Sequence, residues 1–470
     1  MRNKTAYFWG LLSRFAPQII YLGTTMVLAR FLSPDDFGQI GVLSIIFVVA
    51  NVLLDAGLGG SLIKEERITD IDCSSISMFN LAVSIIIYLS LFFTAGLLES
   101  YFAIDGLSYV IRTISLVFPF SALGIVPKAL LNRNLQFRTA FFNSLIGVIG
   151  GSICSIIIAV MKGGVYALVA YQVVNVAITA IANWVSSHYH LSIQFSFDSL
   201  KRLLPFGIIT TIISTIDTIY ENLITTLTGK YLNVQQAGYL YQAKRIEETM
   251  TSSLATAINT VSFPLLTRIK DDRNIFKEEA ASTYKTIICI TAPVLFCVAS
   301  FAEPIIRLLF GEQWIEASDY LVLLIFAGVF IIMESLLRNF IKSLCEVKQL
   351  LYVTFAKRFI GIVILIGALS ISPDYMIYAY IFTSFLGFLA NLVLYCKLID
   401  FSIFKLLVKS IIYIMPGIIY LGVMRLPVVG AMSLAGQIGL AIIILSAIYL
   451  IVLRMFGISI VNWLKSAISK

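Results

Sequence analysis

Polar side chains set within long apolar runs are the residues of this chain that could do chemistry. They are Arg14 and Gln18 in the first run, Asp55 in the second, Asp217 and Glu221 in the seventh, and Lys244, Arg245, Glu247 and Glu248 in the eighth. A charge at the centre of a bilayer costs about 2.5–3.5 kcal/mol on insertion scales. We therefore expect these side chains to face a water-filled cavity or one another.

Three of these side chains are basic and lie well inside their runs: Arg14, Lys244 and Arg245. The guanidinium of arginine binds a phosphate through two parallel hydrogen bonds, and lysine supplies a compact positive charge. Together with Gln18, one helical turn after Arg14, they predict a cavity that binds an anionic substrate. A carrier of drug-like cations would instead show a dominant acidic site, which the position of Arg14 argues against.

The acidic side chains have two interpretations. Asp217 and Glu221 are four residues apart and share one helix face, and Lys244 can reach Glu247 or Glu248 along its own helix. These carboxylates, with Asp55, could carry a coupled proton or Na⁺. Alternatively, they form ion pairs with the basic residues and lock the helices together.

Other charges near the apolar runs have simpler explanations. Glu334 and Arg338 are spaced to form an ion pair along one helix. Four basic residues lie near the ends of runs, where their long side chains can reach the membrane interface. They are Arg112, Lys128, Lys357 and Arg358.

The composition excludes a soluble protein. Of the 470 residues, 59% are hydrophobic and 13% charged, against about 45–50% and 25% in soluble chains. The net charge of +8 does not indicate a nucleic-acid partner, because the basic residues are scattered over short loops. The six cysteines show no metal-binding spacing and there are only two histidines, so we expect no metal and no cofactor.

The apolar runs predict an all-α integral membrane protein of about fourteen transmembrane helices, since about 20 residues span a bilayer. The predicted spans are 7–29, 38–62, 76–97, 109–131, 139–161, 165–187, 203–228, 238–262, 284–305, 319–341, 350–369, 375–397, 405–424 and 431–454. Lys and Arg gather in the loops of one side, which predicts that both termini are cytoplasmic. The loops are short, and the longest lies near residues 263–283.

An internal repeat suggests two halves. The segments 30–38 and 230–238 have similar sequences at an interval of 200 residues, and each joins two apolar runs. We predict a six-helix lobe over residues 1–200, a second over 201–400, and two extra helices with a short tail over 401–470. Because six is even, the lobes form a parallel repeat, an architecture that alternating-access carriers use.

Several segments carry a resemblance to a known family. Residues 13–20, 28–38 and 55–59 resemble the opening of bacterial polysaccharide transporters, and residues 163–169 and 310–314 are similar to further stretches of them. These are the O-antigen and exopolysaccharide flippases of the multidrug/oligosaccharidyl-lipid/polysaccharide exporter superfamily. The resemblance covers about the first 315 residues.

The resemblance implies a fold and an activity. The fold would be two six-helix lobes around a central cavity, with two extra helices. The activity would be transfer of an undecaprenyl-pyrophosphate-linked oligosaccharide from the inner to the outer leaflet of the bacterial inner membrane. In the related lipid II flippases, basic residues on the first and eighth helices line the cavity, and Arg14, Lys244 and Arg245 fall on those helices here. The implied partners are this substrate, membrane lipid, H⁺ or Na⁺, and the glycan polymerase machinery.

Two alternatives remain open from the sequence. One is a cation-coupled antiporter for drugs or other small molecules on the same fold. The other is a membrane glycan polymerase or ligase, which would need large outer loops with catalytic groups. The outer loops of this chain are short, so we predict that it is not an enzyme.

Overall fold

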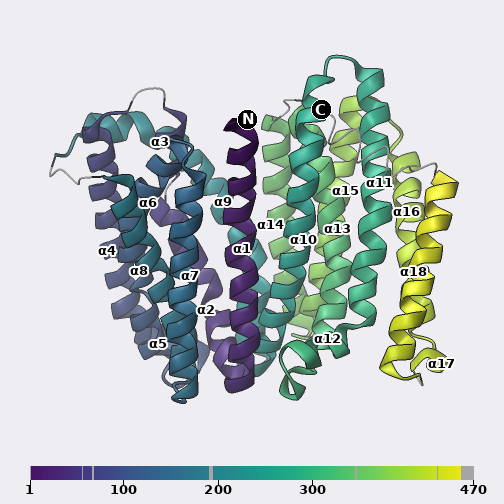
Figure 1. Cartoon of the computed structure of the whole chain (residues 1–470), viewed down its shortest axis with the longest axis horizontal. Coiled ribbons are helices and arrows are strands. Elements are labelled where there is room, and N and C mark those ends of the chain that lie inside the picture. Colours follow the sequence, from purple (N-terminus) through teal and green to yellow (C-terminus); the bar gives the residue numbers. More distant parts are fainter. Residues whose placement is uncertain are drawn as a thin grey trace. The chain divides into compact units, whose positions relative to one another are not determined.

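The fold is described from a computed structural model of the chain, which covers residues 2–55, 57–65, 68–189, 194–344, 347–430 and 432–456. These residues form helices and turns, with no strand among them (Figure 1). The helices of the first half are α1 (Arg2–Phe31), α2 (Pro34–Asp55), α3 (Leu58–Lys64), α4 (Asp70–Phe102), α5 (Leu107–Ile114), α6 (Val117–Arg133), α7 (Phe137–Val160), α8 (Tyr166–Ser187) and α9 (Phe197–Tyr231).

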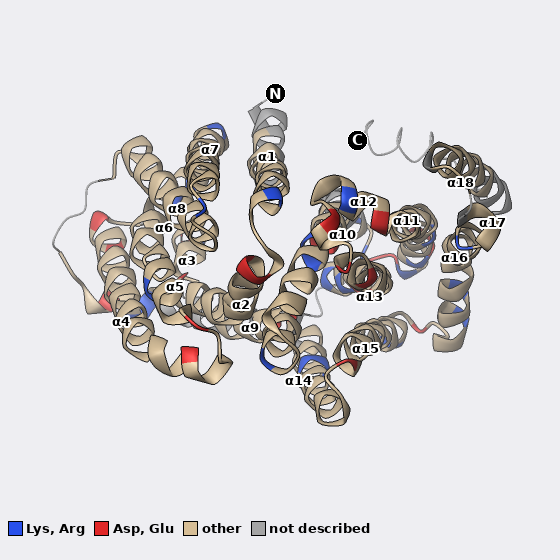
Figure 2. Cartoon of the chain, turned by 90° about the horizontal axis from the view of Figure 1, so that it is seen from below, with Lys and Arg blue, Asp and Glu red and all other residues tan. Residues whose placement is uncertain are grey.

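The second half is also helical. Its elements are α10 (Val234–Arg268), α11 (Arg273–Ser300), α12 (Ala302–Leu309), the short 3-10 turn η1 (Glu312–Trp314), α13 (Ala317–Ser343), α14 (Val347–Ile371), α15 (Tyr375–Ile399), α16 (Ile403–Met424), α17 (Pro427–Gly430) and α18 (Leu434–Phe456). Charged residues are sparse along most of these helices (Figure 2).

The all-α membrane fold is confirmed, but the count of fourteen spans is not. Within the described residues, ten helical stretches are long and apolar enough to cross a membrane. The other four predicted spans fall on α1, α9, α10 and α18. The middle of α10 carries Lys244, Arg245, Glu247 and Glu248, which lowers its hydropathy. Around α18 the qualifying apolar stretch is only Ala435–Tyr449.

Polar side chains fix where several helices begin. Thr69 and Asp72 form a reciprocal capping box at the start of α4, in which each side chain accepts a hydrogen bond from the other's backbone N–H. Ser196 caps α9 through the N–H of Ser199. Asp272 caps α11 through two backbone N–H groups. Helices therefore begin in polar segments outside the apolar runs, and α4 starts six residues before the predicted span at residue 76.

The chain divides into two compact units. Unit 1 comprises Met1–Tyr241 together with Leu309–Trp314, and unit 2 comprises Gln242–Leu308 and Ile315–Lys470. In unit 1, α7 packs along α8 and α1, α6 packs on α8, and α9 packs on α2 and α3. In unit 2, α13 packs along α15, α11 along α16, and α14 along α15. The predicted lobe boundaries at residues 200 and 400 stay a prediction.

The two repeated segments cross one another within unit 1. A Cβ atom added to Gly38 of α2 would lie 1.9 Å from the carbonyl oxygen of Val234, at the start of α10. A Cβ atom added to Gly238 of α10 would lie 2.0 Å from the carbonyl oxygen of Pro34, at the start of α2. Gly238 and Val234 follow Gly38 and Pro34 by 200 residues, so the two contacts are equivalent and the similar segments pack against each other reciprocally.

The segment Leu309–Trp314 packs with unit 1 although the helices on both sides of it belong to unit 2. Trp314 is fully buried, and its indole Nε1 donates to the carbonyl of Ala29, 3.0 Å away. The Gln313 amide donates to the same carbonyl at 2.7 Å. These two bonds satisfy a carbonyl in the last turn of α1, which has no partner within the helix.

Candidate functional site

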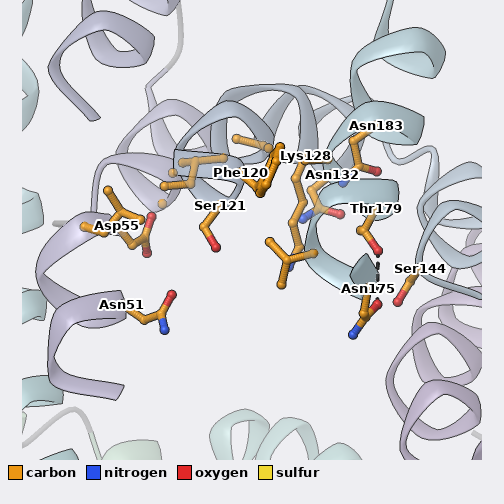
Figure 3. Close-up of a pocket in the computed structure, with 18 of the residues that line it drawn as sticks. Asn51, Asp55, Phe120, Ser121, Lys128, Asn132, Ser144, Asn175, Thr179 and Asn183 are labelled. Atoms are coloured by element: carbon orange, nitrogen blue, oxygen red, sulfur yellow. Dashed lines mark hydrogen bonds between the residues drawn. The ribbon is translucent and has the colours of Figure 1, made fainter. Parts of the chain in front are cut away.

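Unit 1 contains a polar cavity of about 500 Å³. Five helices line it: the end of α2, the start of α3, and the facing sides of α6, α7 and α8 (Figure 3). Its polar lining residues are Asn51, Asp55, Ser121, Lys128, Asn132, Ser144, Asn175, Thr179 and Asn183. Nine polar side chains in one cavity between membrane helices are unusual, because polar groups in lipid are costly.

Asp55 reaches this cavity because the chain turns sharply after α2. Gly57 has φ +66°, in the left-handed region that glycine adopts without strain, and α3 begins at the next residue. A Cβ atom at Gly59 would lie 3.1 Å from the Asp55 carboxylate, so the absence of a side chain there leaves room for it. Asp55 and the glycines Gly59 and Gly60 therefore form one corner of the cavity.

A hydrophobic cluster holds α3 in this position. Leu58 and Leu62 of α3 are fully buried against Ile76 of α4, Val126 of α6 and Leu203 of α9. The hydroxyl of Ser61 also donates to the carbonyl of Leu203 across the cluster, at 3.1 Å. Burial of Leu58 and Leu62 thus holds α3 so that Gly59 and Gly60 line the cavity.

Two glycines of α7 place the amide of Asn175 in the cavity wall. A Cβ atom at Gly147 would lie 1.9 Å from the Thr179 hydroxyl, and one at Gly151 would lie 3.0 Å from Cβ of Asn175. This spacing of small residues lets two helices approach closely. The Thr179 hydroxyl donates to Oδ1 of Asn175 at 3.4 Å, which orients the amide.

A second amide of the cavity lining, that of Asn183, is oriented by hydrogen bonds from a neighbouring helix. Nδ2 of Asn143 on α7 donates to Oδ1 of Asn183 at 3.0 Å, and the Ser186 hydroxyl donates to Asn143 at 3.2 Å. Gly124 of α6 packs closely on Ala180 of α8 and joins the two lining helices. The cavity wall is thus a network whose buried members are hydrogen-bonded, as buried polar groups require.

Asp55 and Lys128 are the charged members of this lining. Both side chains are exposed to the cavity, and the charge of Lys128 attracts the carboxylate of Asp55. The sequence placed Lys128 at the membrane interface, whereas the structure places it in the cavity wall. Amides and hydroxyls supply donors and acceptors on every side, so the cavity suits a ligand rich in hydroxyl groups.

The residues predicted for the site divide between the two units. Arg14, Gln18, Asp55, Asp217 and Glu221 belong to unit 1. The side chain of Arg14 lies outside the described residues, while Gln18 lies on α1 and Asp217 and Glu221 on α9. Of these five, Asp55 lines the cavity described above. The roles of the other four stay predictions.

Lys244, Arg245, Glu247 and Glu248 lie on the part of α10 that belongs to unit 2. Lys244 is 5% exposed, and its ammonium lies 3.3 Å from the carboxylate of Glu248 and 6.0 Å from the ring centre of Tyr380. Glu247 is buried beside Gly328 of α13, where a Cβ atom would lie 2.9 Å from its carboxylate. The predicted pairing of Lys244 along its own helix is confirmed.

No metal site is present in the part of the chain that the structure describes. No group of three or more His, Cys, Asp or Glu side chains there could hold an ion. The residues that the sequence analysis missed are the amides and hydroxyls of α6 and α8. Single Asn and Thr residues within apolar helices carried no signal, and only the fold brings them together.

Comparison with known proteins places this chain in a family. The family model described as polysaccharide biosynthesis protein matches residues 27–319. Succinoglycan biosynthesis transport protein ExoT of Rhizobium meliloti (strain 1021) is 26% identical over 318 residues, which are 67% of this chain and 64% of that protein. Lipopolysaccharide biosynthesis protein WzxC of Escherichia coli (strain K12) is 25% identical over 66% of this chain and 64% of its own length. The chain thus spans slightly less than two thirds of these two relatives.

Solved structures share the fold. Lipid II flippase MurJ in an inward closed conformation superposes with a TM-score of 0.76 at 16% identity, over 96% of this chain and 99% of that one. An inward-facing multidrug resistance MATE family transporter of the MOP superfamily has a TM-score of 0.56 at 15% identity, over 88% and 99%. None of these four proteins is named as an enzyme, in agreement with the prediction for this chain. Because the family model covers more than half of its residues, this multi-pass membrane protein belongs to the polysaccharide biosynthesis protein family.

Proposed function

We propose that this protein is a flippase for lipid-linked oligosaccharides. It moves undecaprenyl-pyrophosphate-linked repeat units from the inner to the outer leaflet of the bacterial inner membrane by alternating access, with both termini cytoplasmic. The observation that carries the proposal is the cavity of unit 1, whose amides and hydroxyls match the hydroxyl groups of a sugar in a chain of the polysaccharide biosynthesis family. The names of ExoT and MurJ support a transport function.

The charges on α1, α9 and α10 have proposed roles in this cycle. Arg14, Gln18, Lys244 and Arg245 bind the pyrophosphate. The carboxylates of Asp55, Asp217, Glu221, Glu247 and Glu248 balance these charges or carry a coupled H⁺ or Na⁺. A membrane potential supplies about 2.3 kcal/mol per charge per 100 mV. When the cell interior is negative, this potential favours the outward movement of an anion. A glycan polymerase that consumes the flipped product is a partner of the same process.

The test is the effect of deleting the gene on lipid-linked sugars. We expect an undecaprenyl-linked oligosaccharide to accumulate on the inner leaflet, and the purified protein in liposomes to move that lipid between leaflets. Asn175→Leu keeps the number and branching of the side-chain heavy atoms and removes the cavity amide. A sugar hydroxyl bound by that amide would lose its partner, so we expect transport to fall about tenfold or more.

The control is Asn134→Leu, because Asn134 is an exposed residue at the end of α6 outside the cavity. It should transport at the rate of the unsubstituted protein. A deletion strain without accumulated lipid-linked glycan, together with liposomes that move drug-like cations but no glycan lipid, would replace the flippase proposal by the antiporter alternative.

A further inference from the structure

The segment Phe310–Trp314, called the strap below, follows α12 and has no role in the cycle proposed above. Its sequence is similar to a stretch of the polysaccharide transporters. The helices on both sides of it belong to unit 2, whereas Leu309–Trp314 packs with unit 1. The chain thus leaves unit 2 at the end of α12, enters unit 1 for the length of the strap, and returns to unit 2 before α13.

The strap has no counterpart in the first half of the repeat. The helices α5 and α12 are equivalent, because each has eight residues with an arginine at the sixth position, and each follows a long helix. Two residues join α5 to α6, but seven residues, Phe310 to Glu316, join α12 to α13. Since α6 and α13 begin 200 residues apart, at Val117 and Ala317, the second half has an insertion the length of the strap.

The strap docks on the end of α1 and the start of α2. Trp314 is 0% exposed, its indole Nε1 donates to the carbonyl of Ala29 at 3.0 Å, and its ring meets that of Phe37 edge-on at 5.1 Å. The Gln313 amide donates to the carbonyls of Ala29 and Leu32 at 2.7 and 3.2 Å. These bonds satisfy carbonyls at the end of α1 that have no partner within the helix.

A glycine gives the strap its shape. Gly311 has φ +103°, which glycine adopts without strain, and a Cβ atom there would lie 3.1 Å from the guanidinium of Arg30. Phe310, the preceding residue, is 1% exposed, and its ring lies 6.0 Å from that of Trp314. The strap is therefore a compact turn with two buried aromatic rings.

The strap has little spare length on the side of α13. Two residues, Ile315 and Glu316, separate Trp314 from Ala317, where α13 begins. The three steps from Trp314 to Ala317 span at most about 11 Å when extended. The helix α13 is itself packed in unit 2 against α11 and α15. A docked strap thus ties the start of α13 to the end of α1.

This tie lies where alternating access requires the most movement. In carriers built from repeats, one half rocks against the other about a site near the bilayer midplane, so helix ends move further than helix middles. Ala29 lies in the last turn of the 30-residue helix α1, and Trp314 lies just before α13. A docked strap with so little slack would restrict the rocking movement.

We propose that the strap is a latch. It docks on α1 and α2 in the conformation described here, and it must leave them before the protein reaches the opposite-facing conformation. The latch rests on the proposed transport cycle and adds a step to it, the breaking of the bonds from Gln313 and Trp314 to the end of α1. Docking favours one conformation over the other, as a ligand selective for one state would.

The first test measures opening of the latch without any transport assay. Phe310→Cys is made in a background without native cysteines, and its reaction with a small thiol reagent is followed in detergent. Because the side chain at residue 310 is 1% exposed, the reaction requires undocking. The control retains Cys289 of α11 as the single cysteine, which is 0% exposed and reports global unfolding. We expect Phe310→Cys to react about tenfold faster or more, since local opening needs less free energy than global unfolding.

A second substitution identifies the bond that holds the latch. Trp314→Phe keeps a ring and removes the donor to Ala29, so it should accelerate labelling of Phe310→Cys by about threefold or more and leave that of Cys289 unchanged. If Phe310→Cys does not fold, Leu32→Cys takes its place, since Leu32 is 2% exposed and its carbonyl accepts from the strap. Equal labelling rates for the strap cysteine and Cys289, or no acceleration by Trp314→Phe, would overturn the latch.

The second test locks the latch. Phe31→Cys and Glu312→Cys place two exposed thiols beside the docked contacts, and a short, reducible bifunctional reagent joins them. We expect the cross-link to block lipid flipping in liposomes and its reduction to restore flipping. The matched control is Met161→Cys with Tyr166→Cys, two exposed positions at the turn between α7 and α8. Cross-linking of the control pair should leave the flipping rate unchanged.

The outcomes separate the latch from the proposed function. Flipping at the uncross-linked rate by the cross-linked strap variant would mean that the strap stays docked throughout the cycle, and the latch would be wrong. If the unsubstituted protein moves no glycan lipid, the flippase proposal fails instead. The labelling rates then still decide whether the strap opens locally, because they involve no substrate.

Discussion

At the scale of single residues, the cavity of unit 1 joins a carboxylate and an ammonium on different helices. Asp55 ends α2 and Lys128 lies on α6, and both are exposed to the cavity. Lys128 acts on Asp55 through its charge, and interactions between exposed charges contribute little to stability, typically below about 1 kcal/mol. Folding therefore gains little from these two charges, and the proposed role of the cavity in binding a ligand gives a testable alternative.

We predict that Lys128→Met lowers transport at least several-fold and leaves the melting temperature nearly unchanged. The methionine keeps an unbranched side chain that is one atom shorter and removes the charge. The measurement is lipid flipping in liposomes together with thermal unfolding in detergent. Lys405→Met is the control, since Lys405 is exposed at the start of α16. A large drop in melting temperature for Lys128→Met alone would indicate a structural role.

The charged residues of these sites could be predicted from the sequence, whereas the neutral polar residues could not. Asp55 was identified because a carboxylate in an apolar run is costly, and the pairing of Lys244 followed from helix geometry. Asn175, Thr179 and Asn183 were missed because neutral polar residues in apolar helices are common and their convergence depends on tertiary packing. The buried charges of unit 2 were predicted in part. Glu334 on α13 pairs with Arg338, as the sequence predicts, and it also pairs with Lys357 on α14. The side chain of Lys357 is 6% exposed and does not reach the interface. Its burial was missed because α14 begins in a polar segment, at Val347.

At the scale of helices, the crossing of α2 with α10 depends on two glycines. The backbone carbonyls of Val234 and Pro34 occupy the positions where side chains of Gly38 and Gly238 would begin. A backbone oxygen cannot move away as a flexible side chain can. The Thr226 hydroxyl of α9 also donates to the carbonyl of Val42, at 3.0 Å, which ties a third helix to the crossing.

We predict that Gly38→Ala and Gly238→Ala each destabilise the protein by about 1–3 kcal/mol or more, the range for overpacking. Because both changes separate the same two helices, the double variant should cost less than the sum of the single variants. Thermal unfolding in detergent measures all three. Gly96→Ala is the matched control: no atom lies within 4 Å of its added Cβ in α4, so it should be neutral or slightly stabilising. Strictly additive losses would mean that the two contacts are independent.

Helix identity was predictable from the apolar runs, and helix ends were not. Each predicted span falls on one helix or on two consecutive helices, but several helices extend into the flanking polar segments, as α4 does from Asp70 to Phe102. The caps at Thr69, Ser196 and Asp272 explain these extensions. The helix break between α2 and α3 lies inside a predicted span. It follows from the left-handed conformation of Gly57, which the spacing of apolar residues does not reveal.

At the scale of the whole molecule, the internal repeat connects the sequence to the transport proposal. The reciprocal packing of Gly38 and Gly238 pairs segments that are 200 residues apart and similar in sequence. A parallel repeat gives two equivalent halves, and carriers use such halves to open a site alternately to each side of the membrane. This use of the repeat requires that both halves enter the membrane with the same orientation, which the even number of predicted spans in each half implies, while the distribution of basic residues predicts which side is cytoplasmic.

That orientation can be tested by labelling single cysteines in a background without the six native ones. Asp105, Asn274 and Asp374 are all exposed residues at helix ends. The segment around Asn274 carries Arg268, Lys270, Arg273 and Lys277, and such basic loops remain on the cytoplasmic side. We therefore expect an impermeant thiol reagent to label Asp105→Cys and Asp374→Cys in spheroplasts, and to label Asn274→Cys only after permeabilisation. Labelling of residue 274 in intact spheroplasts would invert the topology, and an outward-moving flippase would then have to start from the opposite face of the protein.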